Sequence, residues 1–466
     1  MTVTLNPQIM RSVEQLDYAV TIGDVATQAG LELNVAQQGL LALASEAGGH
    51  LQVTDSGDIL YQFPKNFRTI LRNRFWRLRL QELWQKIWGI LFYLIRISFG
   101  IILIISIIVM FLAILAILIA VLIAVNSKDG DSDSGGDRGG FNFVLPPIDI
   151  FWIFNFTPNY YQREPEEVSK HKNSKSVNTL ETFSSVSNYH QQEPKKISKH
   201  ENPKNPKSMN FLESIFSFLF GDGDPNRELE ERRWQTIGSL IRNEGGVIAA
   251  EQVAPYLDNV TSSNQETEDY ILPVLARFNG YPQVSDQGDL IYYFPELQVT
   301  AKKRTLTAIS SYLNEKRWQF SQADSGQIML SLGLGTVNIV LALMLGGLLR
   351  EYGAGVAIAS LIQPVYGVLL IYAIAFLAIP LGRYFWLQWQ NQGIDSRNQK
   401  RQAKAEWLTL PNPKFRQKLQ FAEDFAAEKV ITAADIAYRT DEDLLVQEAE
   451  QSDKIDQEWQ KRLESL

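Results

Sequence analysis

The side chains best suited to bind a metal ion lie together in one short stretch of the sequence, GDGDPNRELEERRW, which follows residue 220. Oxygen-bearing residues in it have the spacing with which a calcium-binding loop begins: Asp222, Asp224 and Asn226. Such a loop also needs glycine at its sixth position and glutamate at its twelfth, where this sequence has Arg227 and Arg233. The same stretch can instead begin a helix that is capped by Asp224 with Pro225 in its first turn, and we favour this second interpretation.

Other reactive groups are scarce. Three of the four histidines, His171, His190 and His200, lie in a polar stretch at residues 159–210, where solvated linker histidines are a simpler interpretation than a metal-binding tract. The chain has no cysteine, which excludes disulfides, thiol catalysis and cysteine-ligated zinc or iron–sulfur clusters within it. We find no Ser/His/Asp order, HExxH motif, P-loop or GxGxxG after a strand. The sequence therefore predicts a protein that is not an enzyme and has no cofactor.

One motif occurs twice in the chain. Residues 40–64 (LLALASEAGGHLQVTDSGDILYQFP) and 271–295 (ILPVLARFNGYPQVSDQGDLIYYFP) are identical at about ten of twenty-five positions without a gap. Each copy predicts an apolar helix, a tight hairpin and a Phe-Pro stop, with the hairpin Tyr and Phe packing against the helices. The shared hairpin residues are Asp55, Gly57, Asp58, Tyr61, Phe63 and Pro64 in the first copy and Asp286, Gly288, Asp289, Tyr292, Phe294 and Pro295 in the second. Leu41/Leu272, Gly49/Gly280, Gln52/Gln283 and Val53/Val284 complete the shared set.

Three helices are expected in each copy, which with the hairpin is the winged helix-turn-helix layout. We expect them at 6–20, 21–31 and 35–48 in the first copy and at 225–243, 247–257 and 263–278 in the second. Thr21 and Asn34 are placed to cap the second and third helices, and Gly30 can end the second. Pro273 should kink the last helix. The sequence therefore predicts winged-helix-like modules at residues 1–64 and 222–300.

Three long stretches without a charge predict membrane-spanning helices, since a span needs roughly 20 apolar residues. They are residues 97–125, 328–349 and 356–381. A further apolar segment, 211–221, is too short to span. Basic, aromatic connectors precede the first two stretches, at 65–96 and 301–327, and by the positive-inside rule they place the N-terminus in the cytoplasm or its plastid equivalent. The expected fold class is an α-helical membrane protein with two winged-helix-like α/β modules.

The remaining segments are expected to be a Gly/Asp-rich, aromatic and disordered polar linker at 126–210 and an acidic helical tail at 382–466. Three crossings would place the N-terminal module and the tail on opposite sides of the membrane. A re-entrant hairpin or two short passes within 84–125 is the alternative that brings both modules to the same side. We prefer three spans, because 84–125 has no turn signal.

Asn338 and Gln363 are the strongly polar residues within the expected spans. Interhelical hydrogen bonding accounts for both, and ion or proton pathways usually need an ionisable residue. Transport is therefore weakly supported. Small residues in the second span allow close helix approach and leave a homo-oligomer through these helices open: Gly333, Gly335, Gly346 and Gly347.

DNA binding is the default function of a helix-turn-helix, but the charges argue against a nucleic-acid partner. The net charge is −8, and the third helix of the first copy has no Lys or Arg. Paired aspartates in both wing turns would repel phosphate, and the basic connectors suit anionic lipid headgroups. We therefore expect a non-enzymatic adaptor or scaffold whose partners are the lipid bilayer and unidentified proteins. The alternatives are a membrane-tethered transcriptional regulator and a transporter or transporter subunit.

Four stretches together resemble a family of uncharacterised membrane proteins of cyanobacteria and plastids. They are QVSDQGDLIYYFPELQVTA (283–301), FLESIFSFLFGDGDPN (211–226), WQFSQA (318–323) and the Gly-rich apolar hairpin. Plant members of that family are assigned to the chloroplast envelope, and some carry an iron–sulfur-cluster-biosynthesis label. The resemblance implies a plasma, thylakoid or envelope membrane location for a multi-pass protein, and it implies no mechanism.

Overall fold

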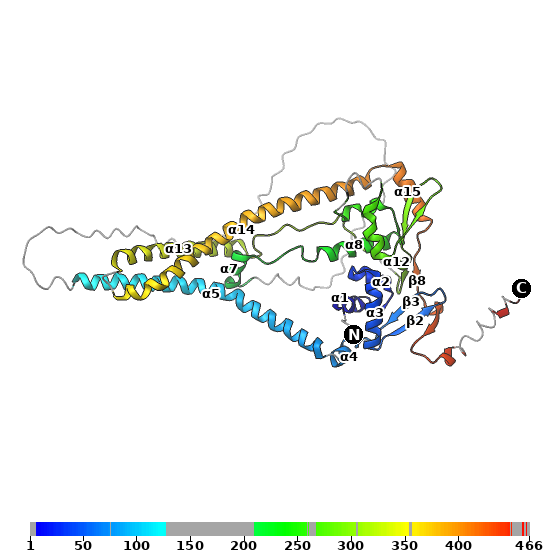
Figure 1. Ribbon diagram of the computed structural model, residues 1–466, viewed down its shortest axis with the longest axis horizontal. Helices are drawn as coiled ribbons and strands as arrows, with labels where there is room; N and C mark the ends of the chain where they lie inside the picture. Colours follow the sequence, from blue (N-terminus) through cyan, green and yellow to red (C-terminus); the bar gives the residue numbers. More distant parts are fainter. Residues whose placement is uncertain are drawn as a thin grey trace, which may run out of the picture. The chain divides into compact units, whose positions relative to one another are not determined.

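The computed structural model describes residues 6–74, 76–126, 209–258, 260, 267–303, 306–353, 357–447, 449, 459–460 and 463 (Figure 1). Nearly all of the expected linker at 126–210, including the three histidines His171, His190 and His200, lies outside these residues.

The first repeat folds as helix, strand, two helices and a hairpin. Its elements are α1 (Pro7–Gln15), β1 (Ala19–Val20), α2 (Ile22–Ala29), α3 (Leu33–Ala47), β2 (His50–Thr54) and β3 (Ile59–Gln62). Thr21 caps α2 as predicted, because its hydroxyl accepts from the Asp24 N–H while the Asp24 carboxylate accepts from the Thr21 N–H. Gly30 ends α2 with φ 64°.

Two predictions for the first repeat are wrong in detail. The first helix does not reach Val20, because Asp17 and Tyr18 adopt left-handed backbone conformations (φ 58° and 67°) that end α1, and Val20 pairs with β3 instead. Asn34 does not cap α3, which begins two residues earlier than predicted, at Leu33, with Glu32 at its N-cap.

The second repeat has the same order of elements. They are α8 (Leu229–Asn243), β4 (Val247–Ile248), α9 (Ala250–Val253), η1 (Ala254–Tyr256), η2 (Asp269–Ile271), α11 (Leu272–Phe278), β5 (Tyr281–Val284) and β6 (Leu290–Tyr293). The strands are ordered β4-β6-β5, as β1-β3-β2 are in the first repeat. Pro273 lies in the first turn of α11, where its missing N–H costs no helical hydrogen bond, so the predicted kink is absent from the described helix. Asp224 accepts the Asn226 N–H in a turn before α8 and does not cap the helix.

The two hairpin turns agree in their hydrogen bonds. Thr54 N–H donates to Asp58 O over 2.9 Å, and Ser285 N–H donates to Asp289 O over 2.9 Å. Gly57 and Gly288 follow with φ 86° and 87°, a region that glycine enters without strain. A Cβ atom at Gly49 or Gly280 would clash with the ring that packs there, Phe63 or Phe294. The shared residues therefore specify one local structure twice.

The repeats pack against each other around a common hydrophobic core. Helix α2 lies against α8 and α12 (Pro295–Gln298), and the core contains the four repeated aromatic residues Tyr61, Phe63, Tyr292 and Phe294. Asp24, which is 4% exposed, pairs with Arg242 across this contact. The same carboxylate accepts from Thr300 Oγ1 over 3.1 Å and from the Ala301 N–H over 3.0 Å. Burial of α2 thus joins the two repeats into one body.

The C-terminal segment also packs on both repeats. It contains α15 (Pro413–Glu423), β8 (Lys429–Val430), η3 (Ala433–Asp435) and β9 (Ile436–Arg439). β9 pairs antiparallel with β2, β8 pairs parallel with β7 (Val299–Thr300), and α15 contacts β4 and β6 (Figure 1). The expected helical tail is therefore wrong for residues 429–430 and 436–439, which form strands because β7 and β2 offer unpaired edges to them.

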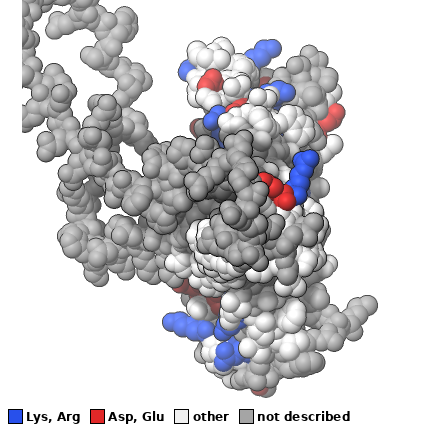
Figure 2. All heavy atoms as spheres, turned by 90° about the vertical axis from the view of Figure 1, so that its left-hand side faces the viewer, with Lys and Arg blue, Asp and Glu red and all other residues white. Residues whose placement is uncertain are grey.

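Among the described residues, three helices are long and apolar enough to cross a membrane. They are Lys86–Ala124 within α5 (Trp76–Asn126), α13 (Ser325–Tyr352) and Ile358–Thr409 within α14 (Ala357–Thr409). α5, which follows α4 (Phe67–Arg74), is continuous and has no turn within 84–125. The short helix α7 (Phe211–Phe220) packs against α13 and α14, and its core joins Phe218 to Leu103 of α5 and Phe376 of α14. On the face in Figure 2, charged side chains are sparse among the described residues.

Replacing Asp24 by Asn should reduce stability by about 3 kcal/mol at pH 7, because Arg242 then loses its buried carboxylate partner. Burial opposes ionisation of Asp24, but Arg242 and the N–H groups of Thr21 and Ala301 outweigh it and hold the pKa below the ordinary 3.8. The stabilisation is therefore complete above about pH 4 and is lost as the pH falls through the lowered pKa. Denaturant unfolding of the full chain at a series of pH values measures this. The free energies of unfolding of wild type and D24N should converge below pH 4. A constant difference down to pH 2 would contradict this assignment.

Candidate functional site

The edge of the hairpin in the first repeat is a binding site that the chain itself fills. Leu51 N–H donates to Thr440 Oγ1 over 2.9 Å, and Thr440 N–H donates to Leu51 O over 3.0 Å. In the adjoining turn, Lys429 Nζ donates to the Asp58 carboxylate over 2.6 Å, and Asp55 N–H donates to Asp435 O over 3.2 Å. The hairpin of the first repeat therefore contacts the C-terminal segment with both its backbone and its Asp58 side chain.

The corresponding edge in the second repeat differs at one decisive position. Pro282 pairs with Tyr292 as Leu51 pairs with Tyr61, so the two residues occupy the same register. Proline has no N–H to donate to an added strand, and it blunts an edge in this way. β5 ends its sheet with Val284 64% exposed and Asp286 in an exposed turn. One repeat therefore accepts a strand, and the other presents a blocked edge.

The repeated tyrosines are both buried but have different partners. Burial raises the pKa of Tyr61, whose hydroxyl has no hydrogen-bond partner among the described residues. The Tyr292 hydroxyl instead donates to Glu268 Oε2 over 2.9 Å, and burial and this carboxylate together raise its pKa. Lys418 of α15 donates to Glu268 and Glu251 over 2.6 and 3.0 Å. The second repeat uses this cluster to hold α15.

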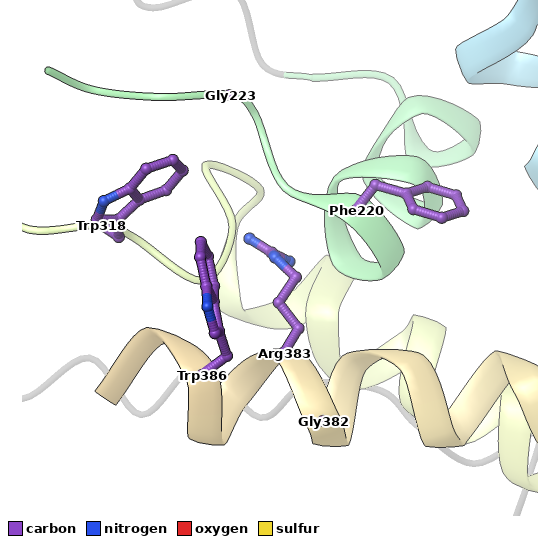
Figure 3. A pocket seen from close by; sticks show the side chains of 6 residues that line it. All are labelled: Phe220, Gly223, Trp318, Gly382, Arg383 and Trp386. Atoms are coloured by element: carbon purple, nitrogen blue, oxygen red, sulfur yellow. The ribbon is translucent and has the colours of Figure 1, made fainter. Parts of the chain in front are cut away.

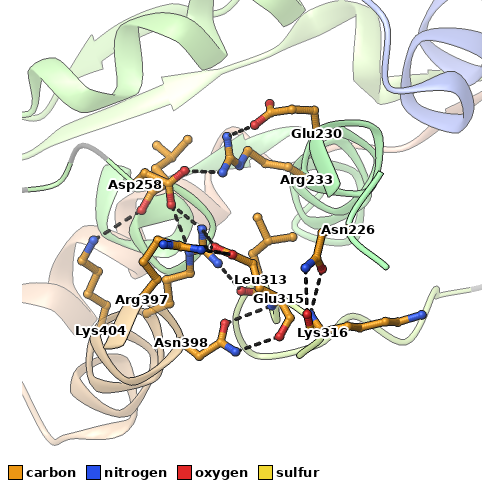
Figure 4. Close-up of polar contacts among 12 residues, drawn as sticks. Asn226, Glu230, Arg233, Asp258, Leu313, Glu315, Lys316, Arg397, Asn398 and Lys404 are labelled. Carbon is orange, nitrogen blue, oxygen red and sulfur yellow. Dashed lines mark hydrogen bonds and ion pairs between the residues drawn. The ribbon is translucent and has the colours of Figure 1, made fainter. Parts of the chain in front are cut away.

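A larger network of charges joins α14 to the second repeat and the connector before α13 (Figure 4). Arg401, which is 2% exposed, pairs with both Asp258 and Glu315 over 2.5 and 2.8 Å. Arg397 adds a second ion pair to Glu315, and Arg233 adds one to Asp258. Burial opposes ionisation of Glu315, but the two arginines outweigh it and lower its pKa. The carboxylates are therefore charged and fully engaged, which suits a structural junction rather than proton transfer.

The candidate calcium ligands do not converge. Asp222 accepts from Arg96 over 2.6 Å and from Ser217 Oγ over 2.5 Å, while the Asn226 side chain exchanges two hydrogen bonds with the backbone of Lys316. Asp224 serves the turn described above. Within the described ranges, no group of three His, Asp or Glu side chains is placed to hold a metal ion.

The polar residues of the apolar helices lie in different surroundings. Asn338 is buried and accepts from Ser106 of α5 over 2.6 Å, a partner that the sequence analysis did not identify. Gln363 is exposed on α14, next to Pro364. Of the four glycines in α13, Gly335 and Gly346 pack against Phe376 and Tyr366 of α14, whereas Gly333 and Gly347 face open space.

A comparison with curated proteins finds an uncharacterised chloroplastic protein of Arabidopsis thaliana. It is 36% identical over 471 residues, an alignment that covers 98% of this chain and 82% of the relative. This chain belongs to the same family. The coarse resemblance drawn from the sequence is thereby confirmed, since the family is uncharacterised and has a chloroplastic member. No protein-family profile matches the chain, and no solved structure matches it.

Sequence reasoning missed most of the partners in these clusters. Arg397, Arg401 and Lys404 are spaced by four and three residues, which already places them on one helix face. That signal indicates a charged face but does not name Asp258 and Glu315. No local pattern marks Lys429 or Thr440 as partners of the first wing.

Replacing Leu51 by Pro should weaken the pairing of β9 with β2. The hairpin itself should be kept, because Pro282 occupies the same register in the second repeat. Losing the N–H donated to Thr440 costs about 1 kcal/mol, which corresponds to roughly five-fold faster exchange of the amides of residues 436–440. Hydrogen–deuterium exchange on the full chain measures this. The control L51A keeps the N–H, and equal exchange in L51P and L51A would contradict the role of this bond.

Proposed function

We propose that this chain is a membrane-anchored, non-enzymatic adaptor in which two winged-helix modules form one body that binds another protein. The shared order helix, strand, two helices and hairpin, with the same strand order in both sheets, supports the winged-helix assignment. The three long apolar helices support anchoring in a bilayer. Engagement of the described carboxylates with arginine and lysine supports an assembly role over a catalytic one.

The partner-binding surface that we propose is the outer face of α3. This helix buries Leu40 and Leu43 against its own repeat, whereas Val35 and Leu41 are 42% and 44% exposed. The other exposed residues of this face are uncharged: Asn34, Gln37, Gln38 and Ser45. Leu272, the repeat counterpart of Leu41, is 58% exposed as well. An exposed apolar residue within a neutral polar rim suits protein contact, and this exposed, uncharged face is the observation that carries the proposal.

The same surface disfavours DNA. Affinity for a duplex comes chiefly from Lys and Arg meeting phosphates, and no residue of α3 is basic. α2, the other helix of the helix-turn-helix, is packed against the second repeat. The first wing is engaged by Lys429 and β9. These contacts leave no basic reading surface on the first module.

We propose that both modules and the C-terminal segment lie on one side of the membrane. The expectation from the sequence was that the N-terminal module and the tail lie on opposite sides. Strands cannot pair through a bilayer, so the β2–β9 ladder supports an even number of crossings between residues 54 and 436. α13 and α14 fit this arrangement as a hairpin whose turn faces the other side. α5 also lies between residues 54 and 436, so an even number requires that α5 either does not cross or is matched by one further crossing.

The family supports a plastid or cyanobacterial membrane as the location, because the Arabidopsis relative is chloroplastic. The envelope in plastids, and the plasma or thylakoid membrane in cyanobacteria, are the specific membranes that we propose, with the N-terminus cytoplasmic or stromal. A direct role as an iron–sulfur scaffold is not part of the proposal, because the chain has no cysteine to ligate a cluster.

Single cysteines test the topology, and each variant carries one thiol because the native chain has none. In sealed membrane vesicles, a membrane-impermeant maleimide should label Gln38→Cys, Gln287→Cys and Asp441→Cys from the same side. Glu351→Cys, in the turn between α13 and α14, should be labelled from the opposite side. Labelling of Asp441→Cys together with Glu351→Cys would overturn the one-sided arrangement.

A photo-crosslinker tests the binding face in the full chain. Placed at Gln38 on α3, it should yield a discrete protein adduct in cells, and Leu41→Asp should reduce that adduct at least ten-fold by adding a charge to the apolar centre. The matched control is the same crosslinker at Gln392, an exposed glutamine of α14. An identical adduct pattern at both positions would count against the adaptor function. Nanomolar, salt-sensitive duplex binding by the full chain would favour a transcriptional regulator instead.

A further inference from the structure

A cavity of about 470 Å³ lies where α7 ends beside α14. Its lining comes from three segments: Phe220 and Gly223 at the end of α7, Trp318 in the connector, and Gly382, Arg383 and Trp386 on α14. Figure 3 shows the Arg383 guanidinium and both indole rings facing the same space. A Cβ atom at Gly223 or Gly382 would meet nothing within 4 Å, so the two glycines keep the cavity open.

Arg383 is held in place by backbone carbonyls. Its guanidinium donates to Phe320 O over 2.5 Å and to Ser217 O and Phe218 O, in the last turn of α7, over 3.4 Å each. Carbonyls at a helix C-terminus have no partner within the helix, and a cation there satisfies them. Gly221 takes φ 78° directly against this guanidinium, where a side chain would clash with it. These contacts therefore hold the Arg383 side chain in one position.

No described carboxylate forms an ion pair with Arg383, although Asp222 lies near enough to stabilise its charge. The nearby acidic residues Glu213 and Asp222 both pair with Arg96, over 2.8 and 2.6 Å. Within the described part of the chain, Arg383 forms no ion pair, and no acidic residue lines the cavity. The lining contributes the Arg383 charge and two indoles, each with one N–H donor and no acceptor, whose ring centroids are 5.5 Å apart. Such a lining favours a ligand rich in acceptor oxygens and negative charge.

The cavity lies at a boundary along α14. On the side toward the α13–α14 turn, Ile379 and Leu381 are exposed apolar residues. On the other side, exposed aromatic residues follow within two turns: Tyr384, Phe385, Trp386 and Trp389. Trp and Tyr gather where a membrane meets water, at the level of the lipid headgroups. The cavity thus opens at the depth of the headgroups if α14 spans the bilayer.

We propose that this cavity binds the anionic headgroup of a membrane lipid, with the acyl chains lying on Phe220, Ile379 and Leu381. The proposal rests on the proposed membrane insertion of α14. The headgroup phosphate supplies the acceptor oxygens that the two indoles and the Arg383 charge attract. A zwitterionic headgroup fits less well, because its own cation meets Arg383.

Soluble short-chain lipids test this on the full chain purified in an uncharged detergent. Dihexanoyl phosphatidylglycerol should raise the thermal unfolding midpoint in a saturable manner, since a ligand that binds the native state stabilises it. Dihexanoyl phosphatidylcholine should need at least a ten-fold higher concentration for half of the effect, and inorganic phosphate should have none. Gly382→Leu, which fills the cavity and keeps Arg383, should weaken the phosphatidylglycerol effect at least ten-fold.

The matched control is Gly367→Leu, on the same helix at another glycine that faces open space. It should respond as the wild type does. Arg383→Gln should weaken binding as Gly382→Leu does, and if it does not fold, Gly382→Leu decides. An equal response to both lipids, an unchanged response in Gly382→Leu, or an equal effect of inorganic phosphate would overturn the proposal. Extraction of the chain from membranes by carbonate would show separately that the membrane insertion is wrong.

Discussion

The backbone hydrogen bonds between β2 and β9 constrain the path of the entire chain. They join Leu51 to Thr440, residues 389 positions apart, and such a ladder cannot form across a lipid bilayer. The second repeat lies between these strands in sequence and packs on the first through α2 and α8, so under the proposed membrane insertion it would share their side. α14 extends far enough for Arg401 to pair with Asp258 of the second repeat and for Arg397 to pair with Glu315 of the connector before α13.

The buried charges of the molecule lie at junctions between elements and not around a reactive centre. Asp24 joins the repeats, Glu315 joins the connector before α13 to α14, and Lys418 joins α15 to the second repeat, while the more exposed Asp258 pairs with Arg401 of α14. Each carboxylate meets a cation from a distant part of the sequence, and loss of one partner leaves a buried charge unpaired, at a cost of several kcal/mol. The junctions therefore make the assembly cooperative. A catalytic cluster would instead direct several such groups into one cavity.

Local patterns in the sequence predicted the local structure well. Thr21 and Gly30 bound α2, the repeated Asp-x-Gly-Asp turns form hairpins, and three long apolar helices occur where charge is absent. Failures arose where a distant partner decides the outcome. Val20 joins a strand because β3 lies beside it, and residues 436–439 form β9 because the β2 edge is open. The clusters at Asp258 and Glu315 were unpredictable for the same reason, since helix spacing shows which residues share a face but not what that face meets.

Pro282 also has a consequence for how the chain reaches its native state. Duplication gave the chain two edges of nearly the same backbone geometry, and β9 follows both of them in the chain, so it is synthesised after them. With two equivalent acceptors, that strand would partition between them, and each molecule placed on the wrong edge would be a kinetic trap. Proline at an outward-facing register removes one backbone donor from the competing edge without disturbing the hairpin that carries it. Pro282 thus makes the two repeated edges unequal, which favours pairing of β9 with β2.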